Sequence, residues 1–388
     1  MTPATWPRPD PLTERLLIID PAVRAYRDAQ VRDLPACLRP GDVLVVNDAA
    51  TLPASLPAIA PSGRSMELRL VGERADGSWD ALLFGEGDWR TPTERRPEPD
   101  LPARGEVFAF EGGLSAKIER VSAVSPRLVA MRFSEEGSAL WSALYRIGRP
   151  VQYSYMKGAL ALWHVQTHYG ARPWAVELPS AGRPLTWRLL RELARTGVRL
   201  ASVTHAAGLS STGDPSLYAA LPFPERYDVP LETVRAVEEA RSRGGRAIAV
   251  GTTVVRALEG CAKAHGGALA AGSGLTDLVI GPGYEPLAVD GLLTGLHEPA
   301  ASHFSLVQAF APPDLLRDAY AHAEAVGYLH HEFGDSCLIL PHVVTPHFAG
   351  IEPARETRER GSAGKPGAGV RASSETTPRT LQVIVRRG

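Results

Sequence analysis

A glycine followed by two threonines, at Gly251, Thr252 and Thr253, is the most informative chemical feature of this chain. It stands within AIAVGTTVVRALE, between an apolar, β-prone run and a segment with apolar residues at helical spacing. The pattern predicts a strand that passes directly into a helix, with these three residues at the crossover. Because a helix N-terminus presents unpaired N–H groups and a partial positive charge, such a turn suits a phosphate or a carboxylate. A plain threonine cap remains the alternative.

A second candidate segment is VDGLLTGLHEP, residues 289–299. It carries Asp290, Thr294 and His297 among glycines and interrupts otherwise apolar sequence. Polar loops of this kind carry function more often than the elements they connect, so the pattern predicts a binding or catalytic loop. Turn residues beside a structurally satisfied histidine are the alternative interpretation.

The segment ELPSAGRPLTW, residues 177–187, allows the same two interpretations. Ser180 and Gly182 either contribute to a binding site or only start the helix that follows.

Histidine spacing offers two weak metal patterns. His164 and His168 are four apart in HVQTH and would share one face of a helix, but no glutamate follows the first histidine and no third ligand is evident. His330 and His331 precede Glu332, although adjacent residues on a strand face opposite ways. We therefore expect no metal. The chain also lacks GxSxG, GxxxxGK[ST] and GxGxxG motifs.

Composition sets the broad class of the protein. The chain has 388 residues, 44% apolar and 22% charged, with a net charge of −1, which is typical of soluble globular proteins and gives no overall basic field. We expect no membrane span, because no run approaches the ~20 apolar residues that a spanning helix needs. The N-terminus lacks an apolar signal core, and three widely spaced cysteines fit a reducing compartment, so the predicted location is cytoplasmic.

The distribution and periodicity of residue types along the chain predict three regions. Residues 61–149 hold short segments that alternate apolar and polar residues between Gly- and Pro-rich turns, which predicts an inserted antiparallel β module, a small barrel. Residues 1–60 and 150–349 alternate strand and helix patterns and predict one α/β main domain with a largely parallel sheet. Residues 350–388 form a basic tail rich in Gly, Ser, Thr and Pro, which we expect to be disordered, with RNA tethering as a less favoured role.

Individual elements follow from periodicity. Strands are predicted at residues 41–48, 198–206, 247–250, 276–283 and 334–340, and helices at residues 185–197, 232–245 and 315–328. In such folds function gathers where parallel strands end. The polar clusters at Thr204–His205, Gly251–Thr253 and Gly281–Gly283 stand at such ends.

Taken together and in order, several motifs resemble those of one family, the S-adenosylmethionine:tRNA ribosyltransferase-isomerases of queuosine biosynthesis. They are GDVLVVND with LPASL, then QTHYG, LPSAG, GTTVVRALE, TDLVIGPGY, VDGLLTGLHEP, LVQAF and FGDSCLI. Each motif alone is weak, but the ordered set is specific and spans residues 13–340.

The resemblance implies a fold and an activity. The fold is a barrel-like α/β main domain with a small antiparallel β-barrel inserted near its N-terminal side. The activity transfers and isomerises the ribosyl moiety of S-adenosylmethionine onto an aminomethyl-deazaguanine base of tRNA, giving epoxyqueuosine and releasing adenine and methionine. The implied partners are thus S-adenosylmethionine and tRNA, with no metal.

The resemblance also nominates site residues. His297 is the leading acid/base candidate, with Asp335 and His205 as further catalytic candidates. The candidate substrate-binding residues are Gln166, Thr167, Ser180, Gly182, Gly251, Thr252, Thr253, Arg256, Asp290, Gly291 and Thr294.

The chain also departs from the family pattern. Residues 49–55 lack two arginines and a threonine, residues 179–185 lack a histidine, and the aromatic stretch before Gly334 is replaced by Leu-His-His-Glu-Phe. Losing arginines is not a mild change where phosphate or carboxylate is recognised. Two alternatives therefore stay open: a divergent paralogue that uses S-adenosylmethionine with a different acceptor, and a catalytically silent RNA- or nucleoside-binding protein.

Overall fold

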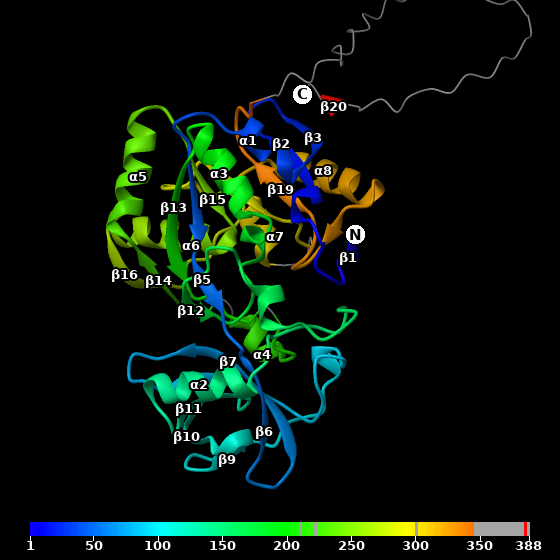
Figure 1. Ribbon diagram of the computed structural model, residues 1–388, viewed down its shortest axis with the longest axis vertical. Helices are drawn as coiled ribbons and strands as arrows, with labels where there is room; N and C mark the ends of the chain where they lie inside the picture. Colours follow the sequence, from blue (N-terminus) through cyan, green and yellow to red (C-terminus); the bar gives the residue numbers. More distant parts are fainter. Residues whose placement is uncertain (210, 221–222, 299–301, 345–383, 386–388) are drawn as a thin grey trace, which may run out of the picture.

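The computed structural model describes residues 1–209, 211–220, 223–298, 302–344 and 384–385. The chain forms a small barrel and a larger α/β unit, which lie at opposite ends of the molecule in Figure 1. The predicted disordered tail lies outside the described residues, apart from Ile384–Val385. No helix among the described residues is long and apolar enough to cross a membrane.

The barrel closes through six antiparallel strands in the order β10-β11-β8-β7-β6-β9. Their bounds are β6 Ser55–Ile59, β7 Ser65–Glu73, β8 Trp79–Phe84, β9 Val107–Phe110, β10 Ser115–Val121 and β11 Leu128–Phe133. Alternate residues of each strand point into one core, so the period-two pattern of the sequence has a direct physical cause. Helix α2 (Gly137–Ile147) packs Leu140 and Leu144 onto this core. The predicted inserted barrel is confirmed, and the domain limits at residues 61 and 149 stay predictions.

The larger unit is built on a ten-stranded mixed sheet, ordered β16-β14-β13-β4-β15-β17-β19-β2-β3-β20. Its strands are β2 Arg15–Asp20, β3 Ala25–Gln30, β4 Val43–Asn47, β13 Arg199–His205, β14 Glu225–Val229, β15 Ala247–Val250, β16 Gly272–Thr276, β17 Gly291–Gly295, β19 Ser336–Ile339 and β20 Ile384–Val385. The α/β class is confirmed. The sheet itself is open, because its end strands β16 and β20 do not pair with each other.

The directions of the strands bring residues that are distant in the sequence to the same end of the sheet. Strands β13, β4, β15 and β17 run parallel, whereas β19 is antiparallel to β17 and parallel to β2. The last residues of the first four strands therefore lie at the same end of the sheet as the first residues of β19 and β2.

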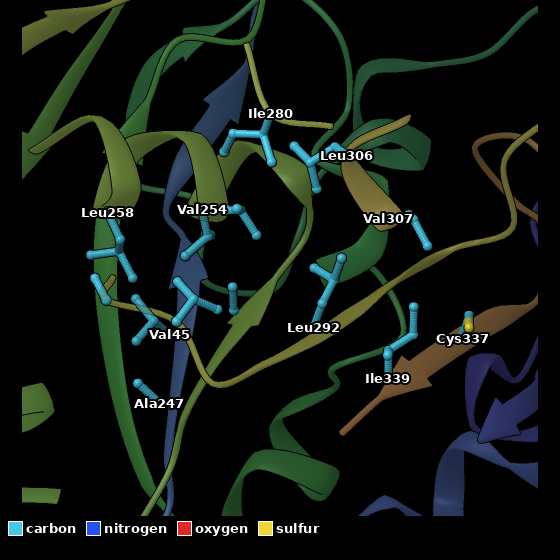
Figure 2. Packing of buried hydrophobic residues seen from close by; sticks show 14 of the residues in the cluster. Val45, Ala247, Val254, Leu258, Ile280, Leu292, Leu306, Val307, Cys337 and Ile339 are labelled. Carbon is cyan, nitrogen blue, oxygen red and sulfur yellow. The ribbon is translucent and has the colours of Figure 1, made fainter. Parts of the chain in front are cut away.

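Helices cover both faces of the sheet. Helices α5 (Leu231–Ser242), α6 (Thr252–Ala264), α7 (Ser302–Val307) and α8 (Pro313–Ala325) lie on one face, and α1 (Leu34–Cys37) and α3 (Trp187–Arg195) on the other. Figure 2 shows Val45 and Leu292 of the sheet together with Val254 and Leu258 of α6. Their chain neighbours Leu44 and Leu293 are buried on the α1/α3 side. Because the central strands are buried on both faces, they are continuous apolar runs in the sequence.

The remaining elements connect the two units and the chain ends. Strand β5 (Ala49–Thr51) pairs with β12 (Arg172–Ala175), and β1 (Thr2–Pro3) pairs with β18 (Leu329–His330), both in parallel. Helix α4 (Pro215–Ala219) is a short helix between the barrel and the sheet (Figure 1).

Two sequence predictions are corrected. The strand predicted at residues 276–283 is wrong: β16 (Gly272–Thr276) ends where that strand was predicted to begin. The carbonyl of Leu278, beyond it, accepts a hydrogen bond from the side chain of Arg256. The loop predicted at residues 289–299 contains the central strand β17. Gly291 packs closely there, since a Cβ atom would lie 2.4 Å from Cδ1 of Leu340 and 3.1 Å from the carbonyl oxygen of Ile339.

Candidate functional site

A cleft of about 2140 Å³ opens at the sheet edge where the strand ends converge, between the sheet and the barrel. Its walls come from the start of α6, the segment after β17 and β14 on one side, and from β7, β8, β10 and β11 of the barrel on the other. Small-molecule pockets usually occupy ~300–1,000 Å³. This cleft is therefore large enough for a small molecule and part of a macromolecule together.

The N-terminus of α6 forms one wall of the cleft. Gly251 is the residue before the helix, with φ 92°, and its N–H donates to the carbonyl of Leu293 at 2.7 Å. This left-handed backbone favours glycine and turns Thr252 and Thr253 into the cleft lining. Asn47, at the end of β4, donates to Thr253 Oγ1 at 3.4 Å. The strand-to-helix turn predicted from the sequence is confirmed, and the helix leaves its first N–H groups free of intrahelical partners.

Arg256, one turn into α6, is held by an ion pair. Its Nε donates to Glu225 Oε2 at 2.7 Å, and a second nitrogen donates to the carbonyl of Leu278 at 2.7 Å. His205 Nε2 lies 3.2 Å from the same Glu225 oxygen. Burial alone would raise the pKa of Glu225, but His205 and Arg256 together lower it to about 2. Glu225 is therefore a carboxylate at neutral pH, and it lines the cleft with Arg256.

His297 lies on the same side of the cleft as the start of α6, in the segment just after β17. Its Nε2 is 2.9 Å from Thr294 Oγ1, and its ring stacks on His303 of α7 with centroids 5.3 Å apart. Burial, followed by the neighbouring His303 and His331, lowers the pKa of His297 to about 3. The ring is thus neutral at pH 7, the form that accepts a proton.

Aromatic and acidic side chains continue this wall. Tyr155 stacks on His331 with centroids 4.5 Å apart and donates a hydrogen bond to Glu332. Burial raises the pKa of Glu332. His330 stacks on His331 at 4.1 Å, because His331 adopts φ 69° and the strand alternation expected at this pair is broken.

The sequence-predicted site residues divide into two groups by position. Those that line the cleft are His297, Ser180, Gly251, Thr252, Thr253, Arg256 and Thr294. Those that do not are Asp335, His205, Gln166, Thr167, Gly182, Asp290 and Gly291. Their roles in catalysis or binding stay predictions.

Residues of the second group contact neighbouring segments of the protein and do not line the cleft. Asp335 is buried, pairs with Arg8 at 2.7 Å and accepts backbone N–H groups from Arg15 and Leu329. Gln166 both accepts from and donates to the backbone of Thr51. These side chains fix neighbouring segments in place rather than facing the cleft.

Two further members of this group are explained by sheet geometry and packing. Asp290 precedes β17 and pairs with Arg241 at 2.8 Å, at the sheet edge opposite the cleft. A Cβ atom on Gly182 would lie 1.9 Å from the hydroxyl of Tyr169, so this glycine permits packing. His164, from the predicted histidine pair, lies in a 3₁₀ turn, where Ala161 N donates to its Nδ1 at 3.0 Å.

Several cleft residues carry no local sequence signal. Glu225, His303 and Tyr155 line the cleft but come from segments that sequence patterns did not single out. The ERYDV strand that carries Glu225 has ordinary alternation. Only the tertiary pairing with Arg256 distinguishes this glutamate from other strand residues.

Comparisons with known proteins agree with the motif order. A family model described as queuosine biosynthesis protein matches residues 2–339. The S-adenosylmethionine:tRNA ribosyltransferase-isomerase of Gloeobacter violaceus is 36% identical over 332 residues, covering 84% of this chain and 89% of that relative. The protein of the same name from Thermus thermophilus is 38% identical over 315 residues, covering 80% and 88%.

A solved structure is also similar. The crystal structure of S-adenosylmethionine tRNA ribosyltransferase from Thermotoga maritima matches with a TM-score of 0.48 and 27% identity, covering 87% of this chain and 96% of that one. From the family model and the curated relatives, the chain belongs to the family of queuosine biosynthesis proteins.

Proposed function

We propose that this protein is an S-adenosylmethionine-dependent ribosyltransferase-isomerase that modifies a deazaguanine base of tRNA. The observation that carries the proposal is the cleft, whose lining brings together the α6 N-terminus, the Arg256–Glu225 pair and His297. Family membership supplies the reaction class, since its relatives carry that name. We place the protein in the cytoplasm, where such tRNA would be met.

S-adenosylmethionine is an α-amino acid joined through a sulfonium to adenosine, and the cleft offers complementary groups for each part. The α6 N-terminus at Thr252 and Thr253 suits the methionine carboxylate. The carboxylate of Glu225, on β14, is paired with Arg256 one turn into α6 and suits a positive charge, whether ammonium or sulfonium. Arg256 holds that carboxylate in position and in its charged form.

The reaction begins with loss of a ribose proton. The sulfonium acidifies the adjacent C5′–H bond, and neutral His297 would accept this proton, leaving an ylide. The ylide electron pair then forms a C4′=C5′ double bond as the C4′–O4′ bond breaks, and the electrons of that bond form a C1′=O4′ carbonyl as adenine leaves C1′ and takes up a proton. The aminomethyl nitrogen of the base adds to C4′ of this vinyl sulfonium and loses a proton, which regenerates an ylide at C5′. That carbon closes onto C1′, and the resulting alkoxide attacks C5′ to form the epoxide as methionine leaves with the electron pair of its C–S bond. Thr294, 2.9 Å from His297 Nε2, orients the ring for the first step.

The barrel side of the cleft would hold the tRNA. Arg74 and Arg120 of the barrel line the cleft, and Arg226 stacks over Trp174 at 3.7 Å on the facing side. Guanidinium groups pair with phosphates, and their planes can also stack on an unstacked base. We assign these residues to the nucleic acid rather than to S-adenosylmethionine.

The experiment is a turnover assay read by mass spectrometry. Purified protein is incubated with S-adenosylmethionine and tRNA that carries the aminomethyl-deazaguanine base. The proposal requires adenine and methionine in equal amounts, together with the mass of the modified tRNA. Bound S-adenosylmethionine with unchanged tRNA would overturn the assignment of the acceptor, and absence of S-adenosylmethionine binding would overturn the proposal as a whole.

A further inference from the structure

Three side chains at the rim of the cleft face one another without hydrogen-bond partners. They are Glu298, which follows His297, and the adjacent His330 and His331. Nδ1 of His330 lies 3.6 Å from Glu298 Oε1, and Nε2 of His331 lies 3.7 Å from the same oxygen. Their potential ligand atoms all lie within 4.8 Å of one another. No residue that the structure describes hydrogen-bonds to any of the three side chains.

The backbone is built to bring the two histidines together. His331 adopts φ 69°, a conformation that is uncommon for residues other than glycine. The turn is closed by two hydrogen bonds, from Gly334 N to His331 O at 2.9 Å and from Asp335 N to Leu329 O at 2.8 Å. Gly334 is needed for it, since a Cβ atom would lie 2.6 Å from the carbonyl carbon of His330. The turn thus puts both rings on one side, where a regular strand would separate them.

The ring of His331 is also held from its other side. Tyr155 stacks on it at 4.5 Å, and His330 stacks at 4.1 Å on the opposite side. Tyr155 is fixed in turn by its hydrogen bond to Glu332. Glu298 has an exposed side chain and is free to adjust toward the pair.

We propose that Glu298, His330 and His331 bind a divalent transition-metal ion, with Zn²⁺ as the preferred ion. Two imidazole nitrogens and one carboxylate oxygen are ligands that suit Zn²⁺ rather than Mg²⁺ or Ca²⁺. Ligand bonds of ~2.0–2.2 Å at tetrahedral angles require the ligand atoms to lie roughly 3.4 Å apart. The separations of 3.6 and 3.7 Å from Glu298 to the two histidines are already within a few tenths of an ångström of that value.

Three protein ligands leave the fourth position of a tetrahedral ion open. Glu298 and His331 both line the cleft, so an exchangeable water or a substrate oxygen would occupy that position from the cleft side. This proposal differs from the sequence-based prediction of no metal, which at His330 and His331 relied on strand alternation. It does not depend on the proposed ribosyl transfer.

The test is metal titration of the full-length protein after chelator treatment and removal of any affinity tag. We expect one Zn²⁺ per chain by isothermal titration calorimetry. Glu298→Gln keeps the size of an exposed side chain, and it should weaken Zn²⁺ affinity at least 10-fold, as should His331→Phe. His168→Asn changes an exposed histidine elsewhere and should leave the affinity unchanged.

Titration with Co²⁺ gives a second measurement. A four-coordinate Co²⁺ site with nitrogen ligands gives visible absorption bands, which Glu298→Gln should shift or remove. Circular dichroism of the metal-free variants separates loss of ligand from loss of fold. Absence of stoichiometric binding, or binding that Glu298→Gln and His331→Phe leave unchanged while both variants stay folded, would overturn the proposal.

Discussion

At the scale of single residues, the cleft sets protonation states by burial and by specific neighbours. Glu225 stays ionised because His205 and Arg256 outweigh the cost of burial, whereas His297 stays neutral because burial dominates. The cleft therefore carries a fixed negative charge at Glu225 and a neutral imidazole at His297. This division is what the proposed proton transfer requires.

His297→Ala should lower kcat for adenine release by ~10²–10⁴-fold, the usual contribution of a positioned acid or base. Because His297 is proposed to act on the reacting bond, the Kd for S-adenosylmethionine should change much less. Single-turnover adenine release and equilibrium binding separate the two quantities. Equal losses in both would argue for a binding role instead.

Glu225→Gln should reduce the loss of unfolding free energy that occurs as the pH falls. The folded-state pKa of Glu225 is about 2 against an ordinary 4.5, so its ionised form adds stability that is present above pH ~4.5 and is lost as pH falls toward 2. At 1.36 kcal/mol per pKa unit the contribution is at most about 3 kcal/mol. Urea unfolding from pH 6 to pH 2 measures it, with the exposed Glu232→Gln as control. An unchanged pH slope in Glu225→Gln would contradict the assignment.

At the scale of elements, helix α6 is positioned by close contact with β16. A Cβ atom added at Gly260 would lie 2.4 Å from Thr276 Oγ1 and 2.6 Å from Thr276 Cβ. The glycine therefore lets the helix lie directly on the strand. This contact, together with the Gly251 turn, fixes where the N-terminus of α6 opens into the cleft.

Gly260→Ala should destabilise the protein by about 1–3 kcal/mol, the usual cost of overpacking a core. The sign is informative, since glycine to alanine within a helix otherwise stabilises by ~1 kcal/mol. Adding Thr276→Gly should restore part of the loss, because it removes the atoms in conflict. Thermal unfolding of both single variants and the double variant gives the coupling, and strictly additive effects would contradict the contact.

At the scale of the whole molecule, the cleft exists only because the inserted barrel stands against one edge of the sheet. Barrel residues such as Arg120 share its lining with α6 and the segment after β17. The net charge of −1 gives no global attraction for RNA. Binding of tRNA must therefore depend on local arginines at the cleft.

Arg120→Ala should weaken tRNA binding and reduce the slope of log K against log salt by about 1, the change expected for one lost phosphate contact. Arg195→Ala, an exposed change at the end of α3, should leave the slope unchanged. Fluorescence anisotropy over a salt series measures both. A wild-type slope near zero would exclude the proposed tRNA surface.

The sequence by itself determined the local elements and the family. Strands such as β4 and β15 and helices such as α3 and α5 were predicted because burial on one or two faces leaves a period in the chain. The barrel was predicted for the same reason, and the ordered motifs gave the family that the comparisons confirm. The prediction of a loop at residues 289–299 was wrong, because this segment contains β17, where Gly291 packs against Leu340.

Only the tertiary structure decided which residues meet. The extended strand β17 places Asp290 and Thr294 at its two ends, with only Thr294 in the cleft, and strand order joins Glu225 to Arg256 across 31 residues. One left-handed residue, His331, turns two histidines to the same side. Periodicity reports which face of an element is buried, because burial acts locally. Which side chains come into contact depends on strand order and on left-handed backbone conformations such as that of His331. Both depend on contacts between residues far apart in the chain.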